Sequence, residues 1–164
     1  MGKYAQRCVF TNFERENFGM ISRKLTKKMT RREAREAVFG LLFEREFRAD
    51  ETAEAIFESS VENREIPADA YVHKAYFAIC EHEAKIDKII GENSVGWKTD
   101  RLTNVSRSIM RLCVYELMFE EDIPTSVSLN EAVELAKKYD EEKARPFING
   151  VLNAVKNALE AKNG

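Results

Sequence analysis

Apolar residues recur every three or four positions through most of this chain, the spacing that places them on one face of an α-helix. The pattern is strongest after residue 104, where Pro124 and the charged run 140–145 divide it into three parts. Three successive amphipathic helices bury their apolar faces against each other, so this half is predicted to be a helical bundle. The predicted inward positions are Val105, Ile109, Leu112, Cys113 and Leu117, then Leu129, Ala132, Val133 and Ala136, then Phe147, Val151, Ala154, Val155, Ala158 and Leu159.

The N-terminal half carries the same spacing. Thr30 and Glu33 can form a capping box, which opens a first helix over about residues 31–47. A second helix begins near residue 50 or 52 and stops before Pro67, because the residue before a proline is pushed out of the helical conformation. The predicted inward positions of these two helices are Ala34, Val38, Leu41, Leu42 and Arg45, then Ala53, Ile56, Phe57, Ser60 and Val61.

A third and longer helix is predicted over about residues 68–92, and a short helical segment near 100–104 precedes the C-terminal three. No stretch of the sequence alternates in the way a strand would. The break near residues 92–98 separates two groups of helices, and Trp97 is expected to fill the junction between them. The predicted fold is all-α, with about seven helices in two small bundles that pack together as one compact domain.

The first helix has a wide apolar surface, because Phe39, Phe43 and Phe47 form a second line at a spacing of four. Either this whole line belongs to the core, or part of it contacts a partner. We predict that Phe43 and Arg107 contact a protein partner. The same wide surface permits a homodimer.

Charge is divided unevenly along the 164 residues. Residues 1–28 carry seven Lys or Arg and two Glu, whereas the rest of the chain carries 19 Lys or Arg against 26 Asp or Glu. Residues 1–28 also lack a steady helical spacing, so they are predicted to be a disordered basic extension, with the folded domain at 29–164. An acidic domain does not hold nucleic acid by bulk charge, so an RNA site requires a local basic patch or a basic partner.

Motifs and composition argue against an enzyme, a metal site and a membrane protein. No apolar run reaches the ~20 residues that cross a bilayer. Cys8, Cys80 and Cys113 are predicted to be free thiols, which fits a cytoplasmic protein. His73 and His82 are expected on opposite sides of one helix, and no phosphate-binding glycine loop or nucleophile motif occurs. We therefore predict no catalytic residue, metal or cofactor.

Arginines at the start of the first helix form one candidate RNA-binding patch. Arg31, Arg32 and Arg35 are neighbours on the helix surface, at an end where the helix dipole disfavours cations. The planar guanidinium suits phosphates and stacks on bases, although an ordinary solvated helix end explains the pattern equally well. We expect that exchanging Arg32 and Arg35 for glutamate weakens RNA binding and leaves thermal unfolding nearly unchanged.

The joint between the last two helices forms a second candidate patch. Cations alternate there with aromatic rings, a mixture that suits single-stranded RNA. The carboxylates at 140–142 cancel much of this charge, and Phe147 also fits the core pattern. The residues of this patch are Lys137, Lys138, Tyr139, Lys143, Arg145, Phe147 and Asn149.

Four blocks in the C-terminal half resemble the signature of the NusB family of transcription antitermination factors: MRLCVYEL at 110–117, DIP at 122–124, SLNEAVELAKKY at 128–139 and PFINGVL at 146–152. The resemblance covers about residues 29–160. It implies a non-enzymatic adaptor that binds boxA-type RNA together with the ribosomal protein NusE. The pair would then join the RNA polymerase elongation complex, chiefly on ribosomal RNA operons. The RNA contacts that it implies are Arg31, Arg32, Arg35, Lys138, Lys143, Arg145, Phe147 and Asn149.

Two positions depart from the family pattern. Asp140 stands where the family often has glycine, and Pro146 stands where a basic residue is common, so we expect either weaker RNA contact at this joint or more reliance on Lys143 and Arg145. Gly150 could permit close helix contact, and Asn149 could bond to free backbone groups instead of RNA. A helical interaction module without RNA contact and a helical enzyme with a carboxylate site remain alternatives. Val151→Asp is expected to unfold the C-terminal bundle, because it buries a charge.

Overall fold

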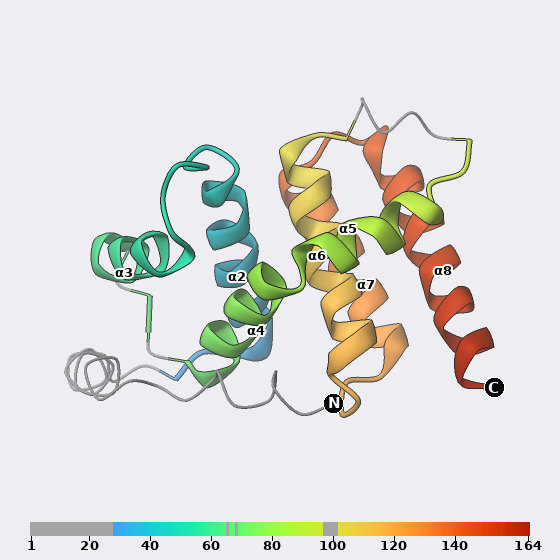
Figure 1. The fold of residues 1–164 in the computed structure, drawn as a ribbon, viewed down its shortest axis with the longest axis horizontal. Coiled ribbons are helices and arrows are strands. Elements are labelled where there is room, and N and C mark those ends of the chain that lie inside the picture. Colours follow the sequence, from blue (N-terminus) through green and yellow to red (C-terminus); the bar gives the residue numbers. More distant parts are fainter. Residues whose placement is uncertain (1–27, 65, 68, 97–101) are drawn as a thin grey trace.

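The computed structural model describes residues 28–64, 66–67, 69–96 and 102–164. These residues form helices and no strand, which confirms the predicted all-α fold (Figure 1). Residues 1–27, which hold most of the predicted extension, lie outside the described residues, as does Trp97. The helices are α2 (Arg31–Arg45), α3 (Ala53–Arg64), α4 (Ala70–Glu81), α5 (Glu83–Glu92), α6 (Asn104–Phe119), α7 (Thr125–Tyr139) and α8 (Ala144–Asn163).

Side-chain caps fix the starts of three helices by accepting hydrogen bonds from first-turn backbone groups. The predicted capping box opens α2: Thr30 Oγ1 accepts from Glu33 N–H at 3.2 Å, and Glu33 Oε2 accepts from Thr30 N–H at 2.8 Å. Asp69 caps α4, and Thr103 caps α6. Because α6 begins immediately after Thr103, the described part of the segment near 100–104 forms no separate helix.

The prediction of one long helix over residues 68–92 is wrong, because the chain bends at His82. The φ and ψ angles of this residue, −101° and 14°, lie outside the α-helical range. Its ring stacks on Phe119 of α6, with centroids 4.8 Å apart. The bend lets α4 pack on α2 while α5 packs on α6 and α8. Neither proline nor glycine marks the bend, so the sequence pattern did not reveal it.

Two groups of helices share one core. In Figure 1, α2, α3 and α4 gather at one end of the molecule and α6, α7 and α8 at the other, with α5 crossing in front of α6. Val38 and Ile79 from the first group and Ile109 and Val151 from the second belong to one continuous cluster of buried side chains. The predicted two-bundle arrangement is therefore confirmed.

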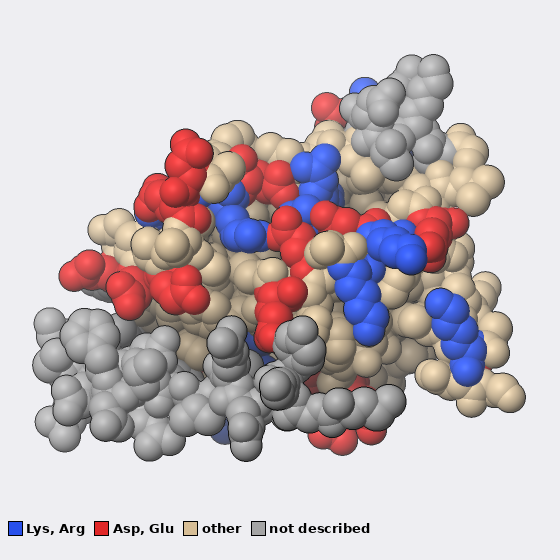
Figure 2. All heavy atoms as spheres, viewed as in Figure 1, with Lys and Arg blue, Asp and Glu red and all other residues tan. Residues whose placement is uncertain are grey.

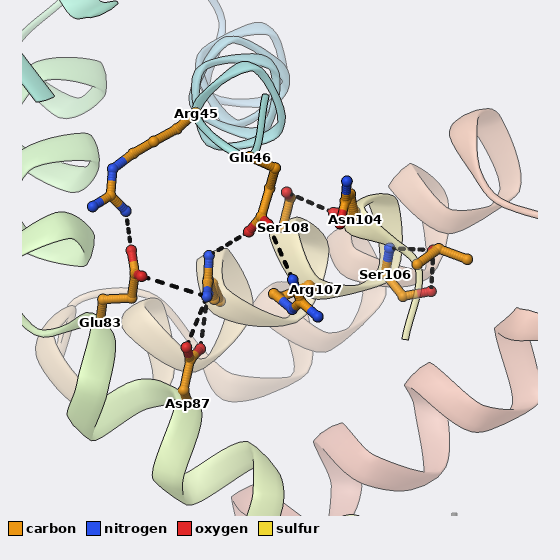
Figure 3. A network of polar contacts seen from close by, with 10 residues as sticks. Arg45, Glu46, Glu83, Asp87, Asn104, Ser106, Arg107 and Ser108 are labelled. Atoms are coloured by element: carbon orange, nitrogen blue, oxygen red, sulfur yellow. Dashed lines mark hydrogen bonds and ion pairs between the residues drawn. The ribbon is translucent and has the colours of Figure 1, made fainter. Parts of the chain in front are cut away.

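A buried arginine ties the end of α2 to α5 and α6. Arg111 of α6 donates to both carboxylate oxygens of Asp87 at 2.8 and 2.7 Å, and to Glu46 at 2.7 Å. Figure 3 shows Glu46, Glu83 and Asp87 converging from the end of α2 and from α5. Burial alone would lower the pKa of Arg111, but hydrogen bonds and charges from these carboxylates outweigh it and raise the pKa. The network fixes the angle between the two groups.

Two cysteines confirm the prediction of free thiols. Cys80 and Cys113 are unpaired, and Cys113 is buried. Burial raises the pKa of the Cys113 thiol, so the group stays protonated and packs as a small apolar side chain.

None of the described helices combines the length and apolar character needed to cross a bilayer.

Candidate nucleic-acid interface

The two predicted basic patches lie next to each other, along a seam between α2 and α7. Arg32 binds Glu131 through two hydrogen bonds, Nε to Oε2 at 3.1 Å and Nη2 to Oε1 at 2.7 Å. Further along both helices, Glu36 accepts from Lys138 Nζ at 2.6 Å. Residue numbers of the two pairs increase in the same order on both helices, so α2 and α7 lie side by side and run in the same direction. We call the strip formed by Arg32, Glu36, Lys138 and Tyr139 the α2–α7 surface.

The first two arginines are exposed and point to different neighbours. Arg31 lies over the ring of Tyr71 on α4, with its guanidinium carbon 4.3 Å from the ring centroid, a cation–π contact. Arg32 turns toward α7 and has a side chain that is 67% exposed. Both guanidinium groups can be reached by a ligand, so RNA contact by these residues stays a prediction.

Arg35 does not belong to this exposed set, and the prediction for it is corrected. It is only 5% exposed, because α6 and α7 cover α2 one turn beyond Arg31. Its Nε donates to Glu116 Oε1 at 2.7 Å, and Glu116 also accepts from Tyr71 and Ser128 at 2.5 and 2.6 Å. This buried carboxylate is therefore bonded by groups from three other helices. Arg35 is a structural residue that joins the two bundles.

The second patch is only partly open. Lys138, Lys143 and Asn149 are exposed, so they remain candidates for RNA contact. Phe147 is only 9% exposed and belongs to the core, so it presents no free ring for base stacking, and that prediction is corrected. Arg145 is half-buried and its Nη2 donates to the Lys137 carbonyl at 3.4 Å, which holds it against the C-terminus of α7.

Asp140 is held by the protein itself. Its Oδ2 accepts from Ser106 Oγ on α6 at 2.5 Å, and its Oδ1 accepts from Glu141 N–H at 2.9 Å. A glycine at this position could make neither side-chain contact. Asp140 thus links the joint after α7 to the start of α6.

Carboxylates accompany the cations of both patches. Besides the two seam pairs, Lys137 lies 2.8 Å from Glu134, and Lys143 lies 3.0 Å from Glu141. Figure 2 shows the same mixture on the face that it draws, where Lys and Arg are interspersed with Asp and Glu. A surface of this kind has little net attraction for polyanions, since non-specific affinity grows with the number of phosphates neutralised.

Gly150 is exposed in α8, and a Cβ atom added there would meet nothing within 4 Å. The expected role in close helix contact is therefore wrong. We expect Gly150→Ala to raise the free energy of unfolding by about 0.5–1 kcal/mol, because alanine favours the helix. Denaturant unfolding measures this gain. Gly91→Ala, equally unobstructed in the last turn of α5, is the matched control, and a loss of stability confined to Gly150→Ala would contradict the prediction.

One of the two predicted partner-contact residues, Phe43, belongs to a row of aromatic rings. Phe43 lies between Phe39 and Phe47, with centroids 6.1 and 5.1 Å away. Phe39, at one end of the row, is buried, and Phe47, at the other end, is 67% exposed. The row therefore begins in the core and ends at the surface. Arg107 lies at the start of α6 and donates to Glu46 at 3.0 Å, as Figure 3 shows. Their contact with a partner stays a prediction.

Both histidines take part in ring packing. His73 lies 4.6 Å from Phe77, and His82 lies 4.8 Å from Phe119, between ring centroids. Within the described ranges, no group of three or more His, Cys, Asp or Glu could hold a metal ion.

Comparison with known proteins identifies the family. The model of the NusB family matches residues 32–157. The transcription antitermination protein NusB of Agathobacter rectalis is 47% identical over 129 residues, which cover 76% of this chain and 97% of that protein. The NusB protein of Bacillus pumilus is 42% identical over 132 residues, 80% of this chain and 98% of the relative. The chain belongs to the NusB family.

Solved structures of NusB proteins share the fold. T. maritima NusB superposes with a TM-score of 0.72 at 38% identity, over 80% of this chain and 93% of that one. A crystal structure of the antitermination factors NusB and NusE in complex with double-stranded RNA gives 0.70 at 34% identity, over 78% and 96%. The NusB resemblance read from the four sequence blocks is thereby confirmed.

The sequence did not reveal the carboxylates of the interface. Glu36 and Glu131 follow ordinary helical spacing, and their partners lie about a hundred residues away in the sequence. The ring that is open at the joint is Tyr139, which is 41% exposed, whereas the predicted contact Phe147 is 9% exposed. The one available signal is the alternation of arginine and glutamate over residues 31–36, which indicates a self-neutralising helix surface.

Proposed function

We propose that this NusB-family chain is a non-enzymatic transcription antitermination factor that binds boxA-type RNA jointly with NusE. It acts in the cytoplasm with the RNA polymerase elongation complex, chiefly on ribosomal RNA operons. The observation that carries the RNA-binding part is the α2–α7 surface, where Arg32 of α2 lies on the same strip as Lys138 and Tyr139 of α7, and exposed Arg31 precedes Arg32 in the first turn of α2. Two weak patches thereby become one strip with exposed cations and an exposed ring, the combination that suits unpaired nucleotides.

A basic partner is needed because this strip is nearly neutral. Glu131 binds Arg32 and Glu36 binds Lys138, and residues 29–164 carry an excess of acidic groups. A ribosomal protein beside the strip would supply the missing cations and would be attracted to the acidic body. A related NusB has been solved together with NusE and double-stranded RNA, which supports joint binding by the two proteins.

The partner side of the site is proposed at the C-terminal half of α2. Phe43 and Phe47 form the outer part of the aromatic row there, and Arg107 lies nearby through its bond to Glu46. Exposed aromatic rings beside an arginine are typical of protein interfaces. A second copy of this chain could use the same face, so NusE binding and self-association would compete.

The test is the affinity for a boxA-like single strand, measured with and without NusE from the same cell, across a salt series. We expect weak binding alone and binding about tenfold or more tighter with NusE, within the usual range of coupling between ligands. The logarithm of the binding constant should fall with the logarithm of salt by about 0.7 per phosphate contacted.

A duplex of the same sequence is the matched control. Preference for the single strand supports contacts to bases, whereas equal binding would mean that only the backbone is read. RNA binding that is absent both alone and with NusE would overturn the proposal. The protein would then be a helical interaction module.

A further inference from the structure

Glu36 holds the two α7 residues that the α2–α7 surface offers to RNA. Its Oε1 accepts from Lys138 Nζ at 2.6 Å and from the hydroxyl of Tyr139. Both donors belong to the last turn of α7, 102 and 103 residues further along the chain. The Glu36 carboxylate therefore occupies the position that a phosphate oxygen would take between this ammonium and this hydroxyl.

The ion pair of Glu36 and Lys138 forms in the free protein, and it is exposed enough for another anion to replace Glu36. Burial would raise the pKa of Glu36, but hydrogen bonds from Lys138 and Tyr139 outweigh it, so the pKa lies below its ordinary value and the group is ionised at neutral pH. The Glu36 side chain is 34% exposed and that of Lys138 is 58% exposed. Ion pairs this open contribute little to stability because solvent screens them, so a phosphate can displace the carboxylate.

Glu131 differs from Glu36 in this respect. Its side chain is 12% exposed, and it lies between Arg32 and Arg35, with 4.0 Å to the Nη1 of Arg35. Replacing it would disturb the buried pair of Arg35 and Glu116. Glu131 is thus part of the scaffold, whereas Glu36 binds Lys138 and Tyr139 on the surface strip.

We propose that Glu36 is an intramolecular competitor for RNA phosphate, which occupies Lys138 and Tyr139 in the free protein and is displaced when RNA binds. This inference rests on the proposed function and deepens it. A polyanion that offers only charge must break the pair for little gain, so non-specific binding is suppressed. A ligand that also stacks on the Tyr139 ring and contacts the partner protein gains enough to displace Glu36.

The test is RNA binding by Glu36→Gln in the full chain with NusE. Glutamine keeps the shape of the side chain and removes its charge. We expect roughly two- to fivefold tighter binding of the boxA-like strand, the factor that corresponds to an exposed ion pair. We also expect a steeper salt dependence, by up to about 0.7 in the log–log slope, because Lys138 then binds phosphate without releasing a carboxylate.

Glu160→Gln is the matched control. It removes the same charge from another Lys–Glu pair, with Lys156 near the C-terminus of α8. Eleven residues of helix separate it from Asn149, about 17 Å, which exceeds the screening length of about 8 Å at physiological salt. As a second control, Glu36→Gln is made in a Lys138→Gln protein and compared with Lys138→Gln alone. The gain in RNA affinity from Glu36→Gln should then disappear.

Three results would overturn the inference. Binding by Glu36→Gln could equal that of wild type, Glu160→Gln could show the same gain, or the gain could persist without Lys138. In all three, wild-type binding with NusE leaves the proposed function intact. No binding by any variant, wild type included, would overturn the proposed function and this inference with it.

Discussion

Replacing Arg35 with methionine is expected to lower the free energy of unfolding by about 3–5 kcal/mol, although sequence spacing places this arginine in a binding patch. The Glu116 carboxylate would lose its charged partner in the core and keep only the hydroxyls of Tyr71 and Ser128. A buried charge without an opposite charge is among the most costly defects that a single substitution produces. Denaturant unfolding at neutral pH measures the loss.

Arg32→Met is the control for this prediction. Arg32 is neighbouring and mostly exposed, so losing its bond to Glu131 should cost much less stability than losing the buried bond of Arg35. Combining Arg35→Met with Glu116→Leu should recover part of the loss, because an apolar pair can replace a buried ion pair. If Arg35→Met unfolds at the same denaturant concentration as Arg32→Met, the pair with Glu116 does not join the bundles.

The burial of Arg35 also corrects an expectation about the paired glutamate substitutions. Exchanging Arg32 and Arg35 for glutamate together would place a second carboxylate beside Glu116, with like charges repelling in the core. Thermal unfolding of that variant would change greatly, so it cannot report on RNA binding alone. Arg32→Glu by itself is the substitution that separates binding from stability.

Helix positions could be predicted from sequence because the signals are local. The capping box at Thr30 and Glu33, the spacing of Val151 and its neighbours, and the free Cys113 all depend on residues within one or two turns. The bend at His82 has no such local signal, and the ring that packs against it, Phe119, comes from another helix. Local spacing therefore located most of the elements but not the break in one of them.

The interface was harder to predict than the fold for the same reason. Spacing shows which side chains share a face of a helix, but not which face a distant helix covers. Arg31 and Arg35 are four residues apart, yet one is open and the other is enclosed by α6 and α7. Glu36 reaches Lys138 across a hundred residues of chain, so no local pattern pairs them.

The pairing of surface cations with carboxylates explains how an acidic chain can carry an RNA site that is weak on its own. A bare basic strip would bind any polyanion, including the many competing transcripts in a cell. A strip in which Glu36 and Glu131 occupy the cations binds weakly until further contacts are added. Under the proposed function, dependence on NusE would follow from the charge balance on the surface of this chain and would require no conformational change.

Val151→Asp is expected to lower the free energy of unfolding at pH 7 by on the order of 4 kcal/mol or more. Val151 is 1% exposed on the face of α8 that packs against α6 and α7. A carboxyl buried there has its pKa raised by three units or more above about 3.9, and each unit corresponds to about 1.4 kcal/mol. Because the folded-state pKa is raised, the penalty is smallest below about pH 4 and grows as pH rises toward the folded-state value.

Val151→Asn is the control that isolates the charge. Asparagine has nearly the same shape as aspartate and loses the same apolar contacts, but it does not titrate in this range. Unfolding of both variants should be followed by denaturant at pH 4 and pH 7. The two should be similarly destabilised at pH 4, and Val151→Asp should be clearly the weaker at pH 7. If the aspartate variant unfolds like the wild type, or its loss does not change with pH, then α8 does not bury this face and the C-terminal bundle is packed differently.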